Sequence, residues 1–253
     1  MTDSAQSSRS RSADLACAGT IEARVAGFDW DRLYDELDER GYALPGKLLS
    51  PQECERLVGD YDRESIYRSR VVMKRHNFGL GEYRYFSYPL PGLIEGLRAA
   101  AYPFLAPLAN RWAARMKQNL RYPEDLGSFL ADCHAQGQER PTPLILKYAA
   151  GDYNCLHQDL YGATSFPLQL AVLLNEPGRD FEGGEFILTE QRPRMQSRAE
   201  VVPIKRGEAV IFCVNERPVQ GARGDYRVKM RHGVSRIRHG NRHTLGMIFH
   251  DAS

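Results

Sequence analysis

A histidine and an aspartate stand two positions apart in the segment "GDYNCLHQDLYG", residues 151–162. On an extended strand, His157 and Asp159 share one face, because strand side chains repeat every second residue. An imidazole nitrogen and a carboxylate oxygen both bind transition metals. A second histidine would complete a two-histidine, one-carboxylate set, which leaves coordination positions open and suits a non-haem Fe(II) oxygenase. The pair alone is a weak signal, since both residue types are common.

The third ligand has four candidates downstream, which are His232, His239, His243 and His250. An oxygenase of this type must also hold a dicarboxylate cosubstrate at its far end, and the planar fork of an arginine matches a carboxylate. That arginine is expected on the strand after the third ligand, roughly ten residues on. Only His232 satisfies this spacing, because Arg242 follows it by ten positions (242 − 232 = 10). Thr244 lies two residues further and would share the strand face of Arg242.

Several other short motifs occur around these residues in a fixed order. "YAAGDYNCLHQD" places Tyr148 and Gly151 before the His-x-Asp pair, "EGGEF" holds a Gly183–Gly184 turn, "RGEAVIF" reads as a strand, and "HGVSRIRHGNR" begins at His232. In this order and spacing, residues 143–251 resemble the 2-oxoglutarate and Fe(II)-dependent dioxygenases. The closest likeness is to a bacterial branch related to prolyl 4-hydroxylases.

This resemblance implies both a fold and a set of ligands. The fold would be α+β, with N-terminal helices packed on a double-stranded β-helix, or jelly-roll. Fe(II) would bind His157, Asp159 and His232, and 2-oxoglutarate would contact Arg242, Thr244 and Tyr148. With O2, these cofactors would hydroxylate a substrate C–H bond and release succinate and CO2, and ascorbate is an expected stimulant of the reaction.

Composition bounds the class of protein. The chain has 253 residues, 42% of them hydrophobic, and a formal net charge of +2. No run approaches the ~18 consecutive apolar residues of a membrane span, so we expect a soluble protein without a membrane partner. The five cysteines are odd in number, scattered and without a CxxC motif. This pattern argues against a disulfide framework and favours a reducing cytoplasm.

The hydrophobic pattern divides the chain into three parts. Residues 1–27 are rich in Ser, Ala and Arg and predict a disordered leader. Residues 28–142 show helical spacing, with helices expected over 29–41, 50–61, 91–117 and 123–134, the third broken near Pro103 or Pro107. Residues 143–253 read as short strands without intervening helices, which predicts an antiparallel sandwich or barrel carrying the oxygenase site.

Charge distribution bears on the substrate. Residues 192–242 contain thirteen Lys and Arg against four Asp and Glu (13 − 4 = +9). The segment 68–88 mixes basic and aromatic residues, and we expect it to form a lid over the jelly-roll. Such a mixture suits a phosphate backbone and stacked or flipped bases. The residues expected to contact substrate are Arg75, Tyr83, Tyr85, Tyr161 and Arg231.

Two substrate classes therefore remain. The basic excess favours oxidative dealkylation of nucleic acid, as in DNA repair, with DNA bound to the basic face 192–242. The motif likeness favours the alternative, a peptidyl-prolyl hydroxylase with a protein substrate. The AlkB-type nucleic-acid oxygenases carry a second arginine six positions after the cosubstrate arginine. Ile248 occupies that position here (242 + 6 = 248), so a strict AlkB-type assignment fails.

Overall fold

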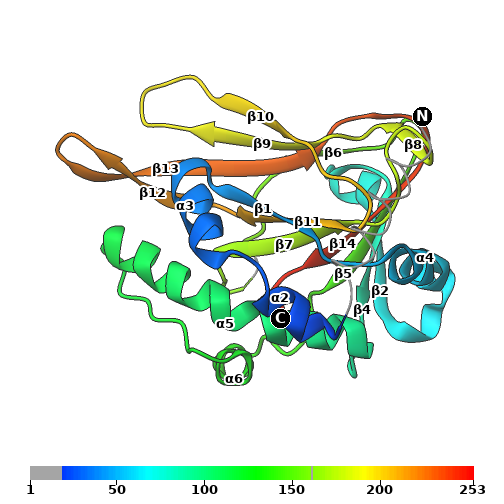
Figure 1. Ribbon diagram of the computed structural model, residues 1–253, viewed down its shortest axis with the longest axis horizontal. Coiled ribbons are helices and arrows are strands. Elements are labelled where there is room, and N and C mark those ends of the chain that lie inside the picture. Colours follow the sequence, from blue (N-terminus) through cyan, green and yellow to red (C-terminus); the bar gives the residue numbers. More distant parts are fainter. Residues whose placement is uncertain (1–18, 161) are drawn as a thin grey trace, which may run out of the picture.

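Two antiparallel β-sheets lie face to face in the computed structural model of this protein (Figure 1). The structure describes residues 19–160 and 162–253. The main path of the eight-stranded sheet runs β1 (Tyr42–Lys47), β11 (Glu208–Cys213), β7 (Leu168–Leu173), β14 (Ile237–Met247), β5 (Leu144–Ala149), β4 (Glu82–Phe86) and β2 (Tyr67–Val72), and β8 (Phe181–Gly183) pairs with β14.

The second sheet has six strands. Its path runs β10 (Arg198–Val202), β9 (Phe186–Gln191), β13 (Gly224–Val234), β6 (Tyr153–His157) and β3 (Gly79–Leu80), and β12 (Glu216–Gly221) pairs with β13. Figure 1 shows this sheet above the eight-stranded one, with its outer face turned away from the long helices. The arrangement confirms the α+β jelly-roll that the sequence predicted.

Helices cover the outer face of the eight-stranded sheet (Figure 1). The described helices are α2 (Ile21–Ala26), α3 (Trp30–Arg40), α4 (Pro51–Gly59), α5 (Gly92–Arg115) and α6 (Leu126–Ala135), with short 3-10 turns η1 (Asp60–Asp62), η2 (Glu64–Ile66) and η3 (Met73–His76). Capping confirms the predicted start of two of them. Asp29 accepts the Arg32 N–H to begin α3, and Ser50 forms a capping box with Glu53 at α4.

Strand alternation divides the core into two layers. On β14, Leu245, Met247 and Phe249 (just past its end) pack against the helices, whereas Arg242, Thr244 and Ile248 face the other sheet. The inner layer, between the sheets, contains the side chains of the candidate site. Both faces of β7 and of residues 242–247 of β14 are therefore largely buried, which fixes their register because a one-residue slip would reverse every side chain.

The expected organisation of the N-terminal half needs correction. Residues 21–26 form α2, which begins at the Thr20 cap, so helical structure starts inside the predicted leader of residues 1–27. Residues 1–18 lie outside the described residues. The segment 28–142 is not purely helical, because β1 pairs with β11 and β4 pairs with β5 across the expected boundary at 143. Helix α5 continues through Pro103 and Pro107, since burial of its apolar face outweighs the lost hydrogen bonds.

The helices also bear on membrane association. Within residues 19–160 and 162–253, none of them combines the length and apolar character that crossing a bilayer requires.

Candidate metal and cosubstrate site

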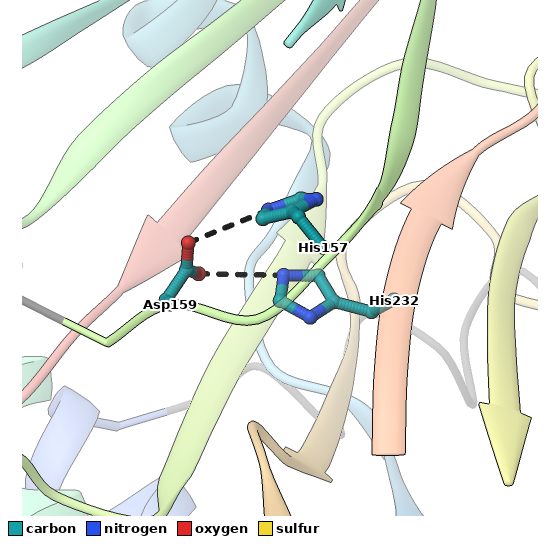
Figure 2. A group of neighbouring side chains, drawn as sticks. All are labelled: His157, Asp159 and His232. Atoms are coloured by element: carbon teal, nitrogen blue, oxygen red, sulfur yellow. Dashed lines mark ion pairs between the residues drawn. The ribbon is translucent and has the colours of Figure 1, made fainter. Parts of the chain in front are cut away.

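The His-x-Asp pair and the third candidate ligand converge on one point between the sheets. His157 is the last residue of β6, and it stands directly opposite His232 on β13 in the strand register. Asp159 follows two residues after the strand ends, so it lies beyond β6 rather than on it. Figure 2 shows the three side chains pointing toward one another. Of the four later histidines, His232 is the one that the structure brings together with the pair.

The spacing of these groups suits a divalent metal. The Asp159 Oδ1 lies 3.4 Å from His157 Nε2, and its Oδ2 lies 3.3 Å from His232 Nε2 (Figure 2). One ligand atom from each residue lies within 4.8 Å of the others. Two ligands about 2.1 Å from a metal and at right angles are about 3.0 Å apart. The three side chains therefore need little movement to bind one ion on a single face.

Contacts behind the ligands fix their orientation. The His157 Nδ1–H donates to the Cys155 carbonyl at 2.7 Å, which directs Nε2 at the centre, where a metal would take the place of any proton on that nitrogen. The Gln169 amide donates to Asp159 Oδ2 at 2.9 Å. The buried His232 Nδ1 has no hydrogen-bond partner within the described part of the chain. Neutral imidazoles and an oriented carboxylate are the donor set that Fe(II) takes in oxygenases.

Proton affinities reflect the crowding of the three groups. Burial raises the pKa of Asp159, but hydrogen bonds from His157 and His232 outweigh it and hold that pKa well below its usual value. Burial lowers the pKa of His157, yet its contacts with Asp159 prevail and raise the pKa. Burial and the neighbouring His157 lower the pKa of His232. The site thus keeps the carboxylate ionised and favours a neutral His232, as metal ligation requires.

Arg242 is a buried cation. Among the described residues, three arginines are at most 1% exposed, which are Arg98, Arg217 and Arg242. Arg98 pairs with Asp251 and Arg217 with Glu190. Arg242 has no carboxylate within 4.0 Å among the residues that the structure describes, and its Nη1 donates only to Thr244 Oγ1 at 2.5 Å. A buried charge without a partner is costly, so a carboxylate that entered the cavity beside Arg242 would offset this cost.

One cavity joins Arg242 to the metal ligands. It has a volume of about 190 Å³, and its polar wall includes the three ligands together with Arg242, Thr244 and Tyr148. Tyr148 stands opposite Arg242 in the β5–β14 register. Its fully buried hydroxyl, which Asn154 approaches, has no hydrogen-bond partner of good geometry among the described residues. The cavity therefore fits a dicarboxylate that chelates a metal at one end and meets Arg242 at the other.

A double-glycine turn leaves room for the arginine. Gly184 has φ +64°, and an added Cβ would lie 2.9 Å from Arg242 Cδ and 2.2 Å from Ile237 Cδ1. Gly183 has φ +75°, and its Cβ would lie 2.3 Å from the Arg236 carbonyl. Only glycine meets both the conformation and the close approach. The "GGE" motif thus positions the stem of Arg242.

The residues expected to contact substrate are distributed unevenly. Tyr83 lines the cavity, and the Tyr85 ring packs edge-on against the Tyr83 ring, with the ring centroids 5.3 Å apart. Arg75 lies exposed in η3, away from the cavity wall. Arg231 neighbours His232 on β13, so its exposed side chain points to the opposite face of the sheet. Tyr161 lies outside the described residues.

The expected lid is part of the sheets. Its strand β3 pairs with β6, and β4 pairs with β5, so the segment is anchored beside the His157 strand. Met73, Phe78 and Tyr83 line the cavity from this segment. Phe78 is 44% exposed and stacks on His76 with ring centroids 5.3 Å apart. An aromatic pair therefore stands at the cavity mouth, and neither of its residues is among the five expected substrate contacts.

The basic stretch 192–242 is less charged at the surface than its composition indicated. Arg242 is in the cavity, and five of the thirteen residues have carboxylate partners, which are Arg192, Arg206, Arg217, Arg227 and Arg238. Seven are exposed with no ion pair to a described residue, namely Arg194, Arg198, Lys205, Arg223, Lys229, Arg231 and Arg236. The basic stretch of thirteen residues therefore contributes seven exposed cations without an ion pair to a described residue.

Comparison with protein families identifies one matching model. Residues 81–252 match Oxygenase-NA, described as an oxygenase catalysing oxidative methylation of damaged DNA. An uncharacterized protein of Mycobacterium tuberculosis is 43% identical over 195 residues, which cover 75% of this chain and 84% of that protein. The matched stretch of the family contains the three candidate ligands and Arg242.

Solved structures share the fold at low sequence identity. A 2OG-Fe(II) oxygenase family oxidoreductase from Burkholderia pseudomallei is 15% identical, with a TM-score of 0.53 over 90% of this chain and 94% of that chain. The non-heme alpha ketoglutarate dependent epimerase SnoN, from nogalamycin biosynthesis, is 14% identical, with a TM-score of 0.51 over 87% and 81% of the two chains. These likenesses concern the jelly-roll fold.

Proposed function

We propose that this chain, which belongs to the Oxygenase-NA family, removes alkyl groups from the bases of damaged nucleic acid. The chain is a dioxygenase of the 2-oxoglutarate and Fe(II)-dependent superfamily. The observation that carries the proposal is the extent of the family match. Residues 81–252 include the metal triad and Arg242 of one cavity, together with all seven unpaired surface cations.

The roles proposed for the site follow from its geometry. His157, Asp159 and His232 would hold Fe(II), and Arg242 with Thr244 would hold the far carboxylate of 2-oxoglutarate. When bound, iron and 2-oxoglutarate use O2 to convert a substrate C–H into C–OH, with succinate and CO2 as products. The largely apolar cavity wall excludes water from this chemistry.

Hydroxylation of an N-alkyl group leads to dealkylation without further protein chemistry. Oxygen insertion converts N–CH3 to N–CH2OH. The C–N bond then breaks, the hydroxyl proton passes to nitrogen by way of water, and formaldehyde leaves. The protein needs only to place the alkyl carbon over the open face of the metal triad and to orient the base.

The mouth of the cavity supports a base as the entering group. Phe78 and His76 present stacked rings beside the opening, and Tyr83 continues the aromatic surface inward. A base stacks on such rings whatever its sequence context, and each stack contributes about 1–3 kcal/mol. Neutral polar groups of Asn154 and Gln158 also line the cavity and are available to contact the base edge.

A second candidate is a peptidyl-prolyl hydroxylase. It is favoured by the apolar wall formed by Leu144, Leu146, Phe186, Phe212 and Val234, which matches an uncharged ring as well as an alkyl group. The spacing of Tyr148 and Gly151 before the His-x-Asp pair also favours this candidate, because it resembles the prolyl 4-hydroxylase motif. A prolyl substrate would gain one oxygen and release no formaldehyde, so the two candidates differ in their products.

A coupled assay tests the proposal. Purified protein with Fe(II), 2-oxoglutarate and an N-methylated oligonucleotide should release equal amounts of succinate and formaldehyde. His157→Ala should abolish both products, whereas the matched control His239→Ala, on an exposed part of β14, should retain them. Succinate without formaldehyde, at the same rate with and without the oligonucleotide, would remove nucleic acid as the substrate.

A further inference from the structure

Two β-hairpins extend from one end of the six-stranded sheet. The first joins β9 to β10 through residues 192–197, and the second joins β12 to β13 through a turn at residues 222–223. In the register, Lys229 of β13 stands opposite Gln191, the last residue of β9. Both turns therefore project from the same end, which Figure 1 shows on the side of the molecule opposite α4.

The cations on this hairpin pair are not neutralised. Arg194, Arg198, Arg223 and Lys229 are exposed and form no ion pair with a described residue. Most nearby acids are already engaged in ion pairs: Glu190 with Arg192 and Arg217, Glu216 with Arg227, and Asp225 with Arg115. Glu200 of β10 accepts a hydrogen bond from the Tyr42 hydroxyl at 3.3 Å, and among the described residues of the two hairpins it is the one acid set against these four cations. The hairpin pair thus presents an excess of positive charge, and its partner should be a polyanion.

Contacts with α5 hold the longer hairpin in place. Arg115, the last residue of α5, donates to both carboxylate oxygens of Asp225 at 2.8 and 2.9 Å. Arg227 donates to the Met116 carbonyl at 2.7 Å. The β12–β13 ladder is unbroken from Glu216 to Gly221. The turn is therefore presented at a fixed distance from the body of the protein.

That distance can be expressed in base pairs. Gly224, at the turn, and His232, at the metal triad, lie on the same strand and are eight residues apart (232 − 224 = 8). A strand rises about 3.3 Å per residue, so the turn lies about 26 Å from the triad. One strand of DNA advances about 3.4 Å per nucleotide, so 26 Å corresponds to about eight base pairs.

We propose that the hairpin pair binds the phosphodiester backbone about eight base pairs from the base that enters the cavity. This inference rests on the proposed function and adds a remote contact to it. Cations at this spacing hold the nucleic acid along the outer sheet without reading its sequence, since phosphate contacts position rather than specify. Arg231, on the outer face between the turn and the triad, lies along the same path.

Binding of fluorescent DNA to the full chain tests the inference. The triple variant R194Q/R198Q/R223Q is compared with wild type and with R56Q/R63Q/R179Q, which removes three exposed arginines elsewhere. Each lost phosphate contact lowers the slope of log K against log salt by about 0.9. The hairpin variant should therefore show a slope about 2.7 shallower on a duplex of about 30 base pairs, and the control should match wild type.

Probes of different length and chemistry show whether the inference fails. Single strands and duplexes of about 10 and about 30 nucleotides are measured, and only the longer probes should distinguish the hairpin variant from wild type. Equal slopes for that variant and wild type on long probes would overturn the inference. Equal wild-type affinity for poly-glutamate of matched charge would overturn it too, in favour of an acidic protein. Failure of the proposed function can be distinguished from failure of this inference. The former appears as a lack of formaldehyde release, whether or not the protein binds DNA.

Discussion

Replacement of Arg242 by methionine should separate cosubstrate binding from folding. Methionine keeps an unbranched apolar stem beside Gly184 and removes the guanidinium. Because Arg242 has no carboxylate partner among the described residues, the substitution leaves no acid stranded in the core. We expect the variant to fold normally and to bind 2-oxoglutarate poorly.

The magnitudes follow from the burial of the side chain. A hydrogen bond to a charged group contributes about 1.5–3 kcal/mol, so loss of a two-bond pair with a carboxylate costs about 3 kcal/mol or more. The KM for 2-oxoglutarate should then rise roughly 150-fold. Burial lowers the pKa of Arg242 to about 10, so at neutral pH the charge destabilises the fold by roughly 3 kcal/mol. Removing it should leave the free energy of unfolding unchanged or higher, within about 1 kcal/mol of lost packing.

The matched controls are the two other buried arginines. Arg98→Met and Arg217→Met each remove the buried guanidinium of an ion pair. Among the described residues, Asp251 then keeps only His134 and Tyr88, and Glu190 keeps only Arg192, which is 40% exposed, so each variant should lose up to about 3–5 kcal/mol of stability. Urea unfolding without cosubstrate measures stability, and succinate release against 2-oxoglutarate concentration measures the KM. An Arg242→Met protein as unstable as Arg98→Met, or one with an unchanged KM, would refute the assignment of Arg242 as a carboxylate site.

Further changes test other parts of the site. Gln169→Leu removes the hydrogen bond that orients Asp159, and metal titration should show affinity about 10–100-fold weaker; unchanged affinity would mean that the contact is incidental. Gly184→Val should raise the KM for 2-oxoglutarate more than Gly178→Val, where a Cβ meets open space, and similar kinetics in the two variants would contradict the role of that turn. His243 and His250 are buried, which lowers each pKa to about 4, so below pH 6.5 the unfolded state takes up protons that the folded state does not. The free energy of unfolding should fall by up to about 1.4 kcal/mol per pH unit for each histidine as pH drops from 6.5 to 4, and urea titrations should show a shallower fall in His243→Phe.

Spacing along strands made the chemical centre predictable. His157 and Asp159 are local neighbours, and the interval from His232 to Arg242 covers the end of β13, a short turn and the first half of β14. Strand alternation then placed Thr244 beside Arg242. These relations depend on the two-residue repeat of a strand and on the number of residues between two positions, and both can be read from the sequence.

Partners distant in sequence were not predictable. Arg217 meets Glu190, and Arg206 meets Glu55 from the opposite end of the chain, so a basic run in the sequence became a mixed surface in the fold. Gln169 is the only polar residue of the buried strand β7, which indicates that it has a specific contact. The sequence does not indicate that this contact is with Asp159.

The N-terminal strands were missed for a local reason. The β1 sequence "YALPGK" contains Pro45 and Gly46, which indicate a turn. In the structure, the β1–β11 register shifts between Ala43 and Gly46, and this irregularity accommodates both residues. Pairing with β11 supplies the strand geometry that the local sequence does not favour.

The most direct test of the central claim is mass spectrometry of two substrate pools treated with the same enzyme. N-methylated oligonucleotides and proline-rich peptides are incubated with the protein, Fe(II), 2-oxoglutarate and O2, with Asp159→Ala as the inactive control. Oxidation of nucleic acid predicts oligonucleotides that are lighter by one methylene group (the methyl exchanged for hydrogen) and unchanged peptides. Peptides heavier by one oxygen, with the oligonucleotides intact, would contradict it.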